Sequence, residues 1–224
     1  FQWFLSIRDK VTGEDLYDEL RQKEHDFDPT FKPYLRKLFN YFGYFPTASD
    51  THVGEYQAYG YEAGENGYNF DGDAQERIEK KQLIADLTSG KTNIKDWLVP
   101  SGEQAIKIMI SIFFNIKEVI PSSIVLNNGA IPQLPDDIAV EVPIVTDASG
   151  MHKVMVENLP AGIIGLLNQQ VSAQRLSVLA AVNGSKELAL QALLCDPVIN
   201  STKAAEGIVN ELFEINRNYI RKCI

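Results

Sequence analysis

The sequence has 224 residues but only two cysteines and three histidines. Cys195 and Cys223 are too few for a disulfide framework or for a four-ligand zinc site, and they fit a reducing, cytoplasmic setting. No apolar run reaches the length that a bilayer-crossing helix needs. The sequence therefore argues against a disulfide-rich secreted domain and contains no recognisable membrane-spanning helix.

Positive charge is also scarce. The 21 lysines and arginines are outnumbered by 30 aspartates and glutamates, which gives a formal net charge of -9. Without a dense basic stripe, a protein of this charge is a poor binder of nucleic-acid phosphates. The 45% share of hydrophobic residues and 23% share of charged residues are typical of a soluble globular protein, and a chain of this length can bury a sizeable core.

Several common catalytic and nucleotide-binding motifs are missing. The chain contains no G-x-G-x-x-G, no Walker loop, no G-x-S-x-G and no H-E-x-x-H. It begins with "FQWFLSI", which has the composition of a buried strand rather than of a chain terminus. We therefore expect a fragment of a longer polypeptide, without a nucleotide site of its own, that self-associates or dissolves poorly when alone.

The first hundred residues predict three helices and a loop. Thr12 is placed to cap a helix that carries acidic residues in its first turn. A second helix is expected over 33–42, ended by Gly43. The Gly-, Asn- and Asp-rich stretch 60–73 predicts a loop, and 74–88 predicts a charged, exposed helix.

The middle of the chain predicts a helix followed by strands. Ser101 and Gln104 form a capping-box pattern ahead of "AIKIMISIFFNI", which is apolar almost all round and predicts a deeply buried helix. Strand composition follows in "SSIVLNN", "IAVEVPIVT" and "HKVMVE", with turns at Asn128-Gly129 and Ser149-Gly150.

The remainder predicts helices, with a break at Asn183-Gly184 and a stop before Pro197. The final helix carries an apolar stripe at helical spacing, formed by Ala205, Ile208, Val209, Leu212, Ile215 and Tyr219. Helices on both sides of one β section predict a single α+β domain over residues 1–224.

The stretch "SDTHVGEYQAYGYE" concentrates groups that can move protons. If a helix begins with Asp50 as its N-cap, His52, Glu55 and Tyr56 share one face at spacings of three and four residues. A carboxylate beside an imidazole fixes its tautomer, and a tyrosine near positive charge can act as a base. This cluster is the candidate reaction centre.

A plain structural role remains open for the same residues. Aspartate is a common helix cap, and the neighbouring tyrosines could simply anchor a loop. The Asn127-Asn128-Gly129 segment is most simply a turn at a strand end. His25 and His152 are weaker candidates.

Four segments resemble glycoside hydrolase family 4. "VLNNGAIPQLPDDIAVEVPIVTDASG" is similar to the C-terminal signature of that family, and "LPAGIIGLLNQQVSAQRLSVLAAVNGSKELALQALLCDPV" continues the match. "FQWFLSIRDKVTGEDLYDEL" resembles the segment after the family's N-H dipeptide. "TASDTHVGEY" is similar to the S-x-H-x-x-E-Y element of members that act on unphosphorylated α-glycosides. The resemblance covers nearly the whole chain.

The resemblance implies an unusual glycosidase related in fold to lactate and malate dehydrogenases. An N-terminal Rossmann domain would hold NAD, and the present chain would be the C-terminal domain that completes the substrate site. This family departs from the usual two-carboxylate mechanism. It implies oxidation at sugar C3 by NAD⁺, polarisation by a divalent metal, usually manganese, and removal of the C2 proton by a tyrosine before elimination at C1 and addition of water.

The resemblance also suggests roles for particular residues. Tyr56 ends the H-x-x-E-Y element and becomes the expected C2 base, while Asp50, His52 and Glu55 become substrate-binding or supporting groups. Trp3 is expected to line the same concave face. Asn128 and Gly129 fall in the motif that faces the cleft, and they complete the candidate substrate-binding set.

The family's metal ligands, a cysteine and a histidine, fall outside this chain, and Cys195 and Cys223 do not match their motif. The chain alone is therefore expected to bind neither NAD nor Mn²⁺ and to be inactive. The implied partners are a small-molecule glycoside, the Rossmann domain and further copies of the protein. A galactoside, glucoside or galacturonide would fit, with phosphorylated sugars less expected.

Two other functions remain possible on the sequence. A substrate domain of a 2-hydroxy-acid dehydrogenase would need a catalytic histidine and a carboxylate-binding arginine, and none of the arginines stands in such a motif. A non-catalytic binding or oligomerisation module would leave the 49–62 cluster turned to solvent.

Overall fold

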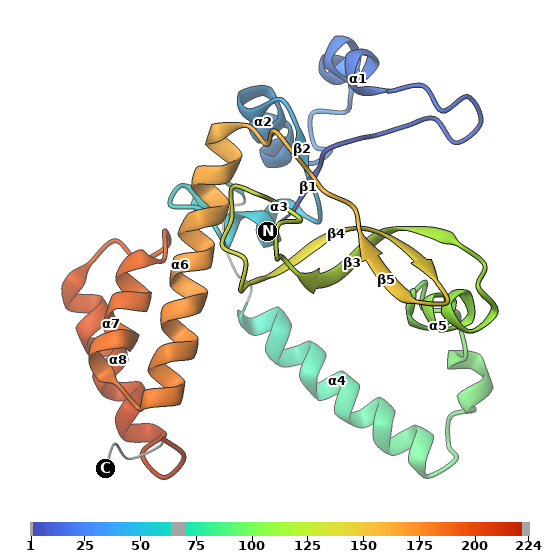
Figure 1. Cartoon of the computed structure of the whole chain (residues 1–224). Helices are drawn as coiled ribbons and strands as arrows, with labels where there is room; N and C mark the ends of the chain where they lie inside the picture. Colours follow the sequence, from blue (N-terminus) through green and yellow to red (C-terminus); the bar gives the residue numbers. More distant parts are fainter. Residues whose placement is uncertain (1, 64–69, 221–224) are drawn as a thin grey trace. The chain divides into compact units, whose positions relative to one another are not determined.

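A computed structural model describes residues 2–63 and 70–220 (Figure 1). The chain divides into two compact units. Unit 1 comprises Phe1–Gly67 and Asn158–Ile224, and unit 2 comprises the intervening Tyr68–Glu157. Helices predominate in unit 1, whereas unit 2 holds a three-stranded sheet, which together give the α+β composition that the sequence predicts.

Unit 1 begins with a short two-stranded sheet. β1 (Trp3–Phe4) pairs antiparallel with β2 (Phe45–Pro46). The prediction of a buried strand over "FQWFLSI" is therefore wrong in extent and burial: two of these residues form the strand, and Phe4 is half exposed. Because successive side chains of a strand point to opposite faces, only one face of this strand contacts the core.

The first helix starts later than predicted. α1 spans Tyr17–Lys23 and is followed by the 3-10 turn η1 (Glu24–Asp26). Thr12 does not cap it: its backbone N–H donates to the carboxylate of Asp9, 2.7 Å away, in a turn before the helix. The prediction fails because the aspartate side chain offers the backbone a competing local hydrogen bond.

The second helix agrees with its prediction. α2 spans Pro33–Phe42, and Gly43 ends it in the left-handed region with φ of 76°. Proline suits the first turn because its missing N–H has no partner there in any helix. Four buried side chains of α2 and α3 form the core of this part of unit 1: Tyr34, Leu35, Leu38 and Val53. Trp3, Phe42 and Phe45 are partly buried and pack against this core.

The candidate reaction centre lies on a short helix. α3 spans Asp50–Gly54, and the 3-10 turn η2 (Gly60–Ala63) follows it. Of the loop predicted over 60–73, residues 64–69 lie outside the described part of the chain. The loop prediction is wrong for residues 70–73, which belong to the next helix, α4 (Phe70–Thr88).

Three helices complete unit 1: α6 (Ala161–Asn183), α7 (Lys186–Cys195) and α8 (Thr202–Ile215), which Figure 1 shows side by side. The break predicted at Asn183-Gly184 is confirmed, since Gly184 ends α6 with φ of 63°. In α8, Ala205 and Val209 are buried, whereas Ile208, Leu212 and Ile215 are exposed. Tyr219, the last member of the predicted stripe, lies beyond the end of the helix.

Unit 2 begins with two solvated segments. α4 (Phe70–Thr88) is the predicted charged helix, and its described side chains are mostly exposed. Ion pairs between successive turns, such as Arg77 with Asp73 at 2.8 Å, run along its surface. The 3-10 turn η3 (Ile94–Trp97) follows.

The sheet of unit 2 has the order β3-β4-β5, all antiparallel (Figure 1). Its strands are β3 (Glu118–Leu126), β4 (Ala139–Asp147) and β5 (Gly150–Lys153). β4 agrees with its prediction to within one residue. β3 begins four residues before the predicted strand, and only His152 and Lys153 of the third predicted strand lie in β5. Alternate residues of β4 are buried: Val140, Val142, Ile144 and Thr146. These residues lie on one face of the strand, and β4 is in contact with α5.

The helix predicted to be deeply buried is exposed. α5 spans Ala105–Phe114, and Ser111 is its one fully buried residue. The capping box is also absent, because Ser101 binds the N–H of Glu103 and no side chain caps the helix. The prediction is wrong because the apolar composition of a helix does not determine which of its faces meets the sheet. Here the face that carries Ser111 meets the sheet, where the serine hydroxyl forms a hydrogen bond with Thr146.

Candidate active site

The predicted cluster forms on α3 and the turn after it. The Nδ1 atom of His52 lies 3.4 Å from a carboxylate oxygen of Glu55. The rings of His52 and Tyr56 meet edge to face, with centroids 5.5 Å apart and an interplanar angle of 84°. The spacing of three and four residues therefore brings all three side chains together on one face, as the sequence predicts.

Asp50 is not the cap of this helix. Ser49 is the N-cap, and its hydroxyl accepts a hydrogen bond from the N–H of His52 at 3.3 Å. Asp50 stands one position later and turns to the neighbouring helix. Its carboxylate accepts hydrogen bonds from the N–H groups of Tyr34 at 3.3 Å and Leu35 at 3.0 Å.

Two tyrosines near α3 have a pKa above the ordinary value. Burial raises the pKa of Tyr34, and the nearby negative groups of Tyr59, Glu62 and Asp50 raise it further. Burial also raises the pKa of Tyr59. Tyr56 is partly buried, and its ring meets that of His52 edge to face.

No sequence pattern pointed to Gln57, which follows the cluster. Its side chain is 2% exposed, and among the described residues neither its amide oxygen nor its amide nitrogen has a hydrogen-bond partner. The turn around it is tight: a Cβ atom on Gly60 would lie 1.8 Å from the carbonyl oxygen of Gly54. Only glycine allows this approach of the two backbones.

The Asn127-Asn128-Gly129 segment is a strand-end turn in unit 2. Asn128 and Gly129 have φ angles of 38° and 85°, and the N–H of Ala130 closes the turn on the carbonyl of Asn127 at 2.8 Å. Positive φ at two successive positions favours asparagine and glycine. The backbone conformation of this turn is therefore enough to explain why asparagine and glycine occupy positions 128 and 129, whether or not they also contact a substrate.

Asn127 has a structural role that was not predicted from the sequence. Its side chain is fully buried and fixes the loop before β4. The amide nitrogen donates to the carbonyls of Ile131, Leu134 and Pro135 at 2.9–3.1 Å, and the amide oxygen accepts from the N–H of Ile131 at 2.7 Å. Its place as the first asparagine of the motif was the only available signal.

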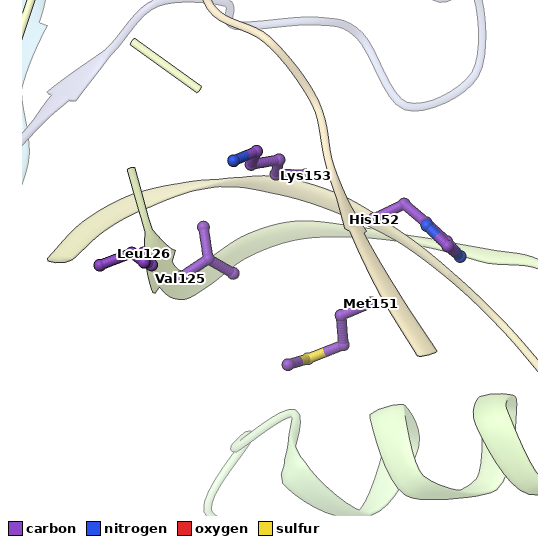
Figure 2. A pocket seen from close by; sticks show the side chains of 5 residues that line it. All are labelled: Val125, Leu126, Met151, His152 and Lys153. Atoms are coloured by element: carbon purple, nitrogen blue, oxygen red, sulfur yellow. The ribbon is translucent and has the colours of Figure 1, made fainter. Parts of the chain in front are cut away.

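Lys153 binds the same turn from β5. Its ammonium group donates to the carbonyls of Asn127 at 2.9 Å and Asn128 at 2.5 Å. Figure 2 shows Lys153 at a hollow of the sheet surface, whose other lining residues come from β3 and β5: Val125, Leu126, Met151 and His152. The lysine thus stabilises the turn rather than remaining available to an anion.

Within residues 2–63 and 70–220, no three His, Cys, Asp or Glu side chains are grouped so as to hold a metal ion. His52 and Glu55 supply two donors of the right kind. Three protein ligands are usual in a catalytic zinc site, and comparable metals need similar support. The described residues therefore do not by themselves fit a metal cofactor.

Comparison with known proteins identifies the class of the domain. The pattern of the "Family 4 glycosyl hydrolase C-terminal domain" matches residues 1–199. The chain belongs to glycoside hydrolase family 4.

Two curated relatives carry glucosidase names. The chain is 28% identical over 248 residues to "Phospho-alpha-glucosidase PagL" of Clostridium acetobutylicum, a match that covers 98% of this chain and 54% of the relative. It is 29% identical over 201 residues to an "Alpha-glucosidase" of Erwinia rhapontici, covering 84% of this chain and 40% of the relative. The chain thus spans about half the length of these relatives, or less.

The fold is that of the corresponding half of a solved enzyme. A 6-phospho-alpha-glucosidase from gut microorganisms, solved in complex with NAD and Mn²⁺, superimposes with a TM-score of 0.76 at 27% identity. The match covers 99% of this chain and 54% of that enzyme. The α+β fold predicted for a family 4 C-terminal domain is therefore confirmed. Among the described residues, no helix combines the length and apolar character needed to cross a membrane.

Proposed function

We propose that this chain is the C-terminal domain of an NAD- and Mn²⁺-dependent glycosidase that cleaves α-glucosides or related α-glycosides in the cytoplasm, and that Tyr56 removes the C2 proton of the sugar. The observation that carries the proposal is the contact of His52 on α3 with Glu55 and Tyr56 in the turn after it, in a chain that belongs to family 4.

The chemistry divides between this chain and the rest of the enzyme. NAD⁺ and a divalent metal, held largely by residues outside this chain, would supply oxidation at C3 and polarisation of the sugar oxygens. That oxidation acidifies the neighbouring C2–H bond. Tyr56, as tyrosinate, would accept the C2 proton as the bond between C1 and the leaving oxygen breaks, and that oxygen would take a proton from solvent and depart as the alcohol. Water would then add at C1 with return of a proton to C2, and NADH would return the hydride to C3.

The neighbours of Tyr56 suit that task. The carboxylate of Glu55 orients the imidazole of His52. The imidazole ring in turn meets the ring of Tyr56 edge to face. Asp50, which binds the N-terminus of α2, would hold α3 in place for the reaction and need not touch the sugar.

The substrate is proposed as a class. The names of the relatives include a phospho-alpha-glucosidase and an alpha-glucosidase, so glucosides with and without a 6-phosphate must be compared directly. The sequence element "SDTHVGEY" favours the unphosphorylated sugar. α-Galactosides and α-galacturonides complete the panel.

The test uses the full-length enzyme with NAD⁺, Mn²⁺ and a reductant, and follows cleavage of p-nitrophenyl α-glycosides and their 6-phosphates. Tyr56→Phe should lower kcat about 100-fold or more. Tyr61→Phe, a nearby exposed tyrosine, is the matched control and should remain close to wild type.

A second readout isolates the proton step. In deuterated solvent, the wild type should exchange the C2 hydrogen of the substrate, and Tyr56→Phe should lose this exchange while NADH still forms. Persistent exchange in the variant would show that another group is the base. If the wild type cleaves no glycoside of the panel, the glycosidase proposal is wrong and a non-catalytic role becomes the better explanation.

A further inference from the structure

Tyr56 lies just beyond the last residue of α3, Gly54. In an unbroken helix, the N–H of Gly60 would bind the carbonyl of Tyr56, four residues earlier. Here that N–H binds the carbonyl of Gln57 instead, at 3.0 Å. The carbonyl of Tyr56 therefore stands outside the regular helical ladder, where a side chain from elsewhere in the fold can bind it.

The side chain of Gln170 binds this carbonyl. Its amide nitrogen donates to the carbonyl oxygen of Tyr56 at 3.4 Å, across 114 positions of the sequence. Gln170 is half-buried and lies in α6, on the same helical face as Ile163 and Ala173, which are both buried. The face of α6 that carries Gln170 therefore packs into unit 1.

The start of α6 approaches the end of α2 closely, and Figure 1 shows the two elements next to each other. A Cβ atom on Gly162 would lie 3.0 Å from a ring atom of Phe42, so glycine allows this approach. Eight residues later, after about 12 Å of helix, α6 reaches the carbonyl of Tyr56. Both α2, through the carboxylate of Asp50, and α6, through the amide of Gln170, thus bind the segment that carries the candidate base.

The backbone of Tyr56 is held on both sides. Its N–H donates to the carbonyl of Val53 at 3.2 Å, and its carbonyl accepts from Gln170. These two contacts set the direction of the Cα–Cβ bond, and the edge-to-face contact with His52 restricts the ring. The hydrogen bond from Gln170 therefore acts, through the backbone, on where the hydroxyl of Tyr56 lies.

We propose that Gln170 is a positioning residue for Tyr56, whose hydrogen bond sets the reach of the tyrosine hydroxyl toward the C2 proton of the sugar. This inference rests on the proposed function, in which Tyr56 is the base. A length of 3.4 Å is at the long end for an N–H···O hydrogen bond, and contacts at a reaction centre often shorten when substrate binds. A displacement of about 1 Å can slow a reaction about 100-fold, so one bond to this backbone is enough to affect the rate.

The test uses the full-length enzyme with NAD⁺, Mn²⁺ and the p-nitrophenyl α-glycoside that it cleaves fastest. Gln170→Met keeps the length of the side chain and removes the donor. It should lower kcat and the rate of C2 hydrogen exchange in deuterated solvent about tenfold, while KM and the initial formation of NADH stay close to wild type. Gln169→Met is the matched control, because Gln169 is the preceding residue of α6 and is exposed, and it should behave as wild type.

Gln170→Glu separates positioning from packing. At high pH, the introduced carboxylate faces the carbonyl oxygen of Tyr56 and repels it, so C2 exchange should be slower than in Gln170→Met. At low pH, the protonated carboxyl group can donate to that carbonyl, and the rate relative to Gln170→Met should rise. A ratio of the two rates that stays constant with pH would overturn the proposal, since lost packing alone gives that result.

Amide hydrogen exchange followed by mass spectrometry tests the contact without substrate. In Gln170→Met, the backbone amides of residues 53–60 should exchange faster than in the wild type and in Gln169→Met. Unchanged amide exchange, unchanged C2 exchange, or equal losses of C2 exchange and NADH formation would each overturn the proposal.

The proposed function fails on different observations: persistent C2 exchange in Tyr56→Phe, or no cleavage by the wild type. In either case the role of Gln170 in catalysis fails with it, and the amide exchange of residues 53–60 still shows whether Gln170 holds the backbone of Tyr56.

Discussion

The carboxylate of Asp50 lies 3.0 Å from the backbone nitrogen of Leu35, fifteen positions earlier in the chain. The same carboxylate binds the N–H of Tyr34. Pro33, at the start of α2, has no N–H, and the preceding Lys32 makes no side-chain cap. Asp50 therefore satisfies the first free donors of α2, and its negative charge lies at the positive end of the helix.

Asp50→Ala should lower the free energy of unfolding by about 1–2 kcal/mol, because two helix donors lose their partner. Urea unfolding measures the change, and Asp71→Ala in the first turn of α4 is the control on an exposed acidic residue. If stability were unchanged while activity of the full-length enzyme disappeared, Asp50 would instead serve the substrate.

Asn127 should be far more sensitive than Asn128. Asn127→Asp replaces a buried amide that donates to three carbonyls by a group that repels them, so we expect a loss of about 4 kcal/mol or a failure to fold. Asn128→Asp keeps a residue type that accepts positive φ, and it should cost about 1 kcal/mol or less. Thermal unfolding of both variants measures the difference. Equal losses would show that the turn conformation, rather than the buried amide, controls stability.

Gln57→Met should stabilise unit 1 by about 1 kcal/mol, because it keeps the volume of the side chain and removes a buried amide that has no partner among the described residues. Gln170→Met is a useful comparison, since the amide of Gln170 does have a partner, the carbonyl of Tyr56 at 3.4 Å. Chemical denaturation distinguishes the two. A destabilised Gln57→Met would indicate that a water molecule or another part of the enzyme binds this amide.

The turn between β4 and β5 should have its own acid dependence. The hydroxyl of Ser149 and the imidazole of His152 both bind the carboxylate of Asp147, and these hydrogen bonds hold its pKa well below the ordinary 3.8. A lowered pKa in the folded state means that this contribution to stability is present above about pH 4 and is lost as the pH falls further.

Carbon NMR titration of the carboxyl group measures this effect. The pKa of Asp147 should rise toward its ordinary value in Ser149→Ala, and by less in His152→Ala, since the Ser149 hydroxyl is the larger cause. Asp147→Asn should remove the corresponding part of the acid sensitivity of unfolding. An Asp147 that titrates at its ordinary pKa in the wild type would mean that the turn is not formed in solution.

Local chemistry was readable from the sequence where it acts over a few residues. Gly43 and Gly184 ended the predicted helices because glycine adopts the left-handed conformation easily. The spacing of His52, Glu55 and Tyr56 placed them on one helical face. The β-branched composition indicated β4 to within one residue and the second half of β3, but only the last two residues of β5. The resemblance to family 4, carried by long ordered motifs, anticipated the match over residues 1–199.

Only the tertiary structure decided which side chains serve the framework. Asp50 caps a helix fifteen residues earlier in the chain rather than its own. The side-chain amide of Asn127 donates hydrogen bonds to backbone carbonyls of the loop that Asn127 begins. The buried hydrogen bond between Ser111 and Thr146, residues 35 positions apart, holds the Ser111 side of α5 inward, with Ile108 and Ile112 partly buried beside it, and leaves the other apolar side chains of the helix exposed. A sequence pattern records how apolar a helix is, but the partner across the fold determines which face becomes the core.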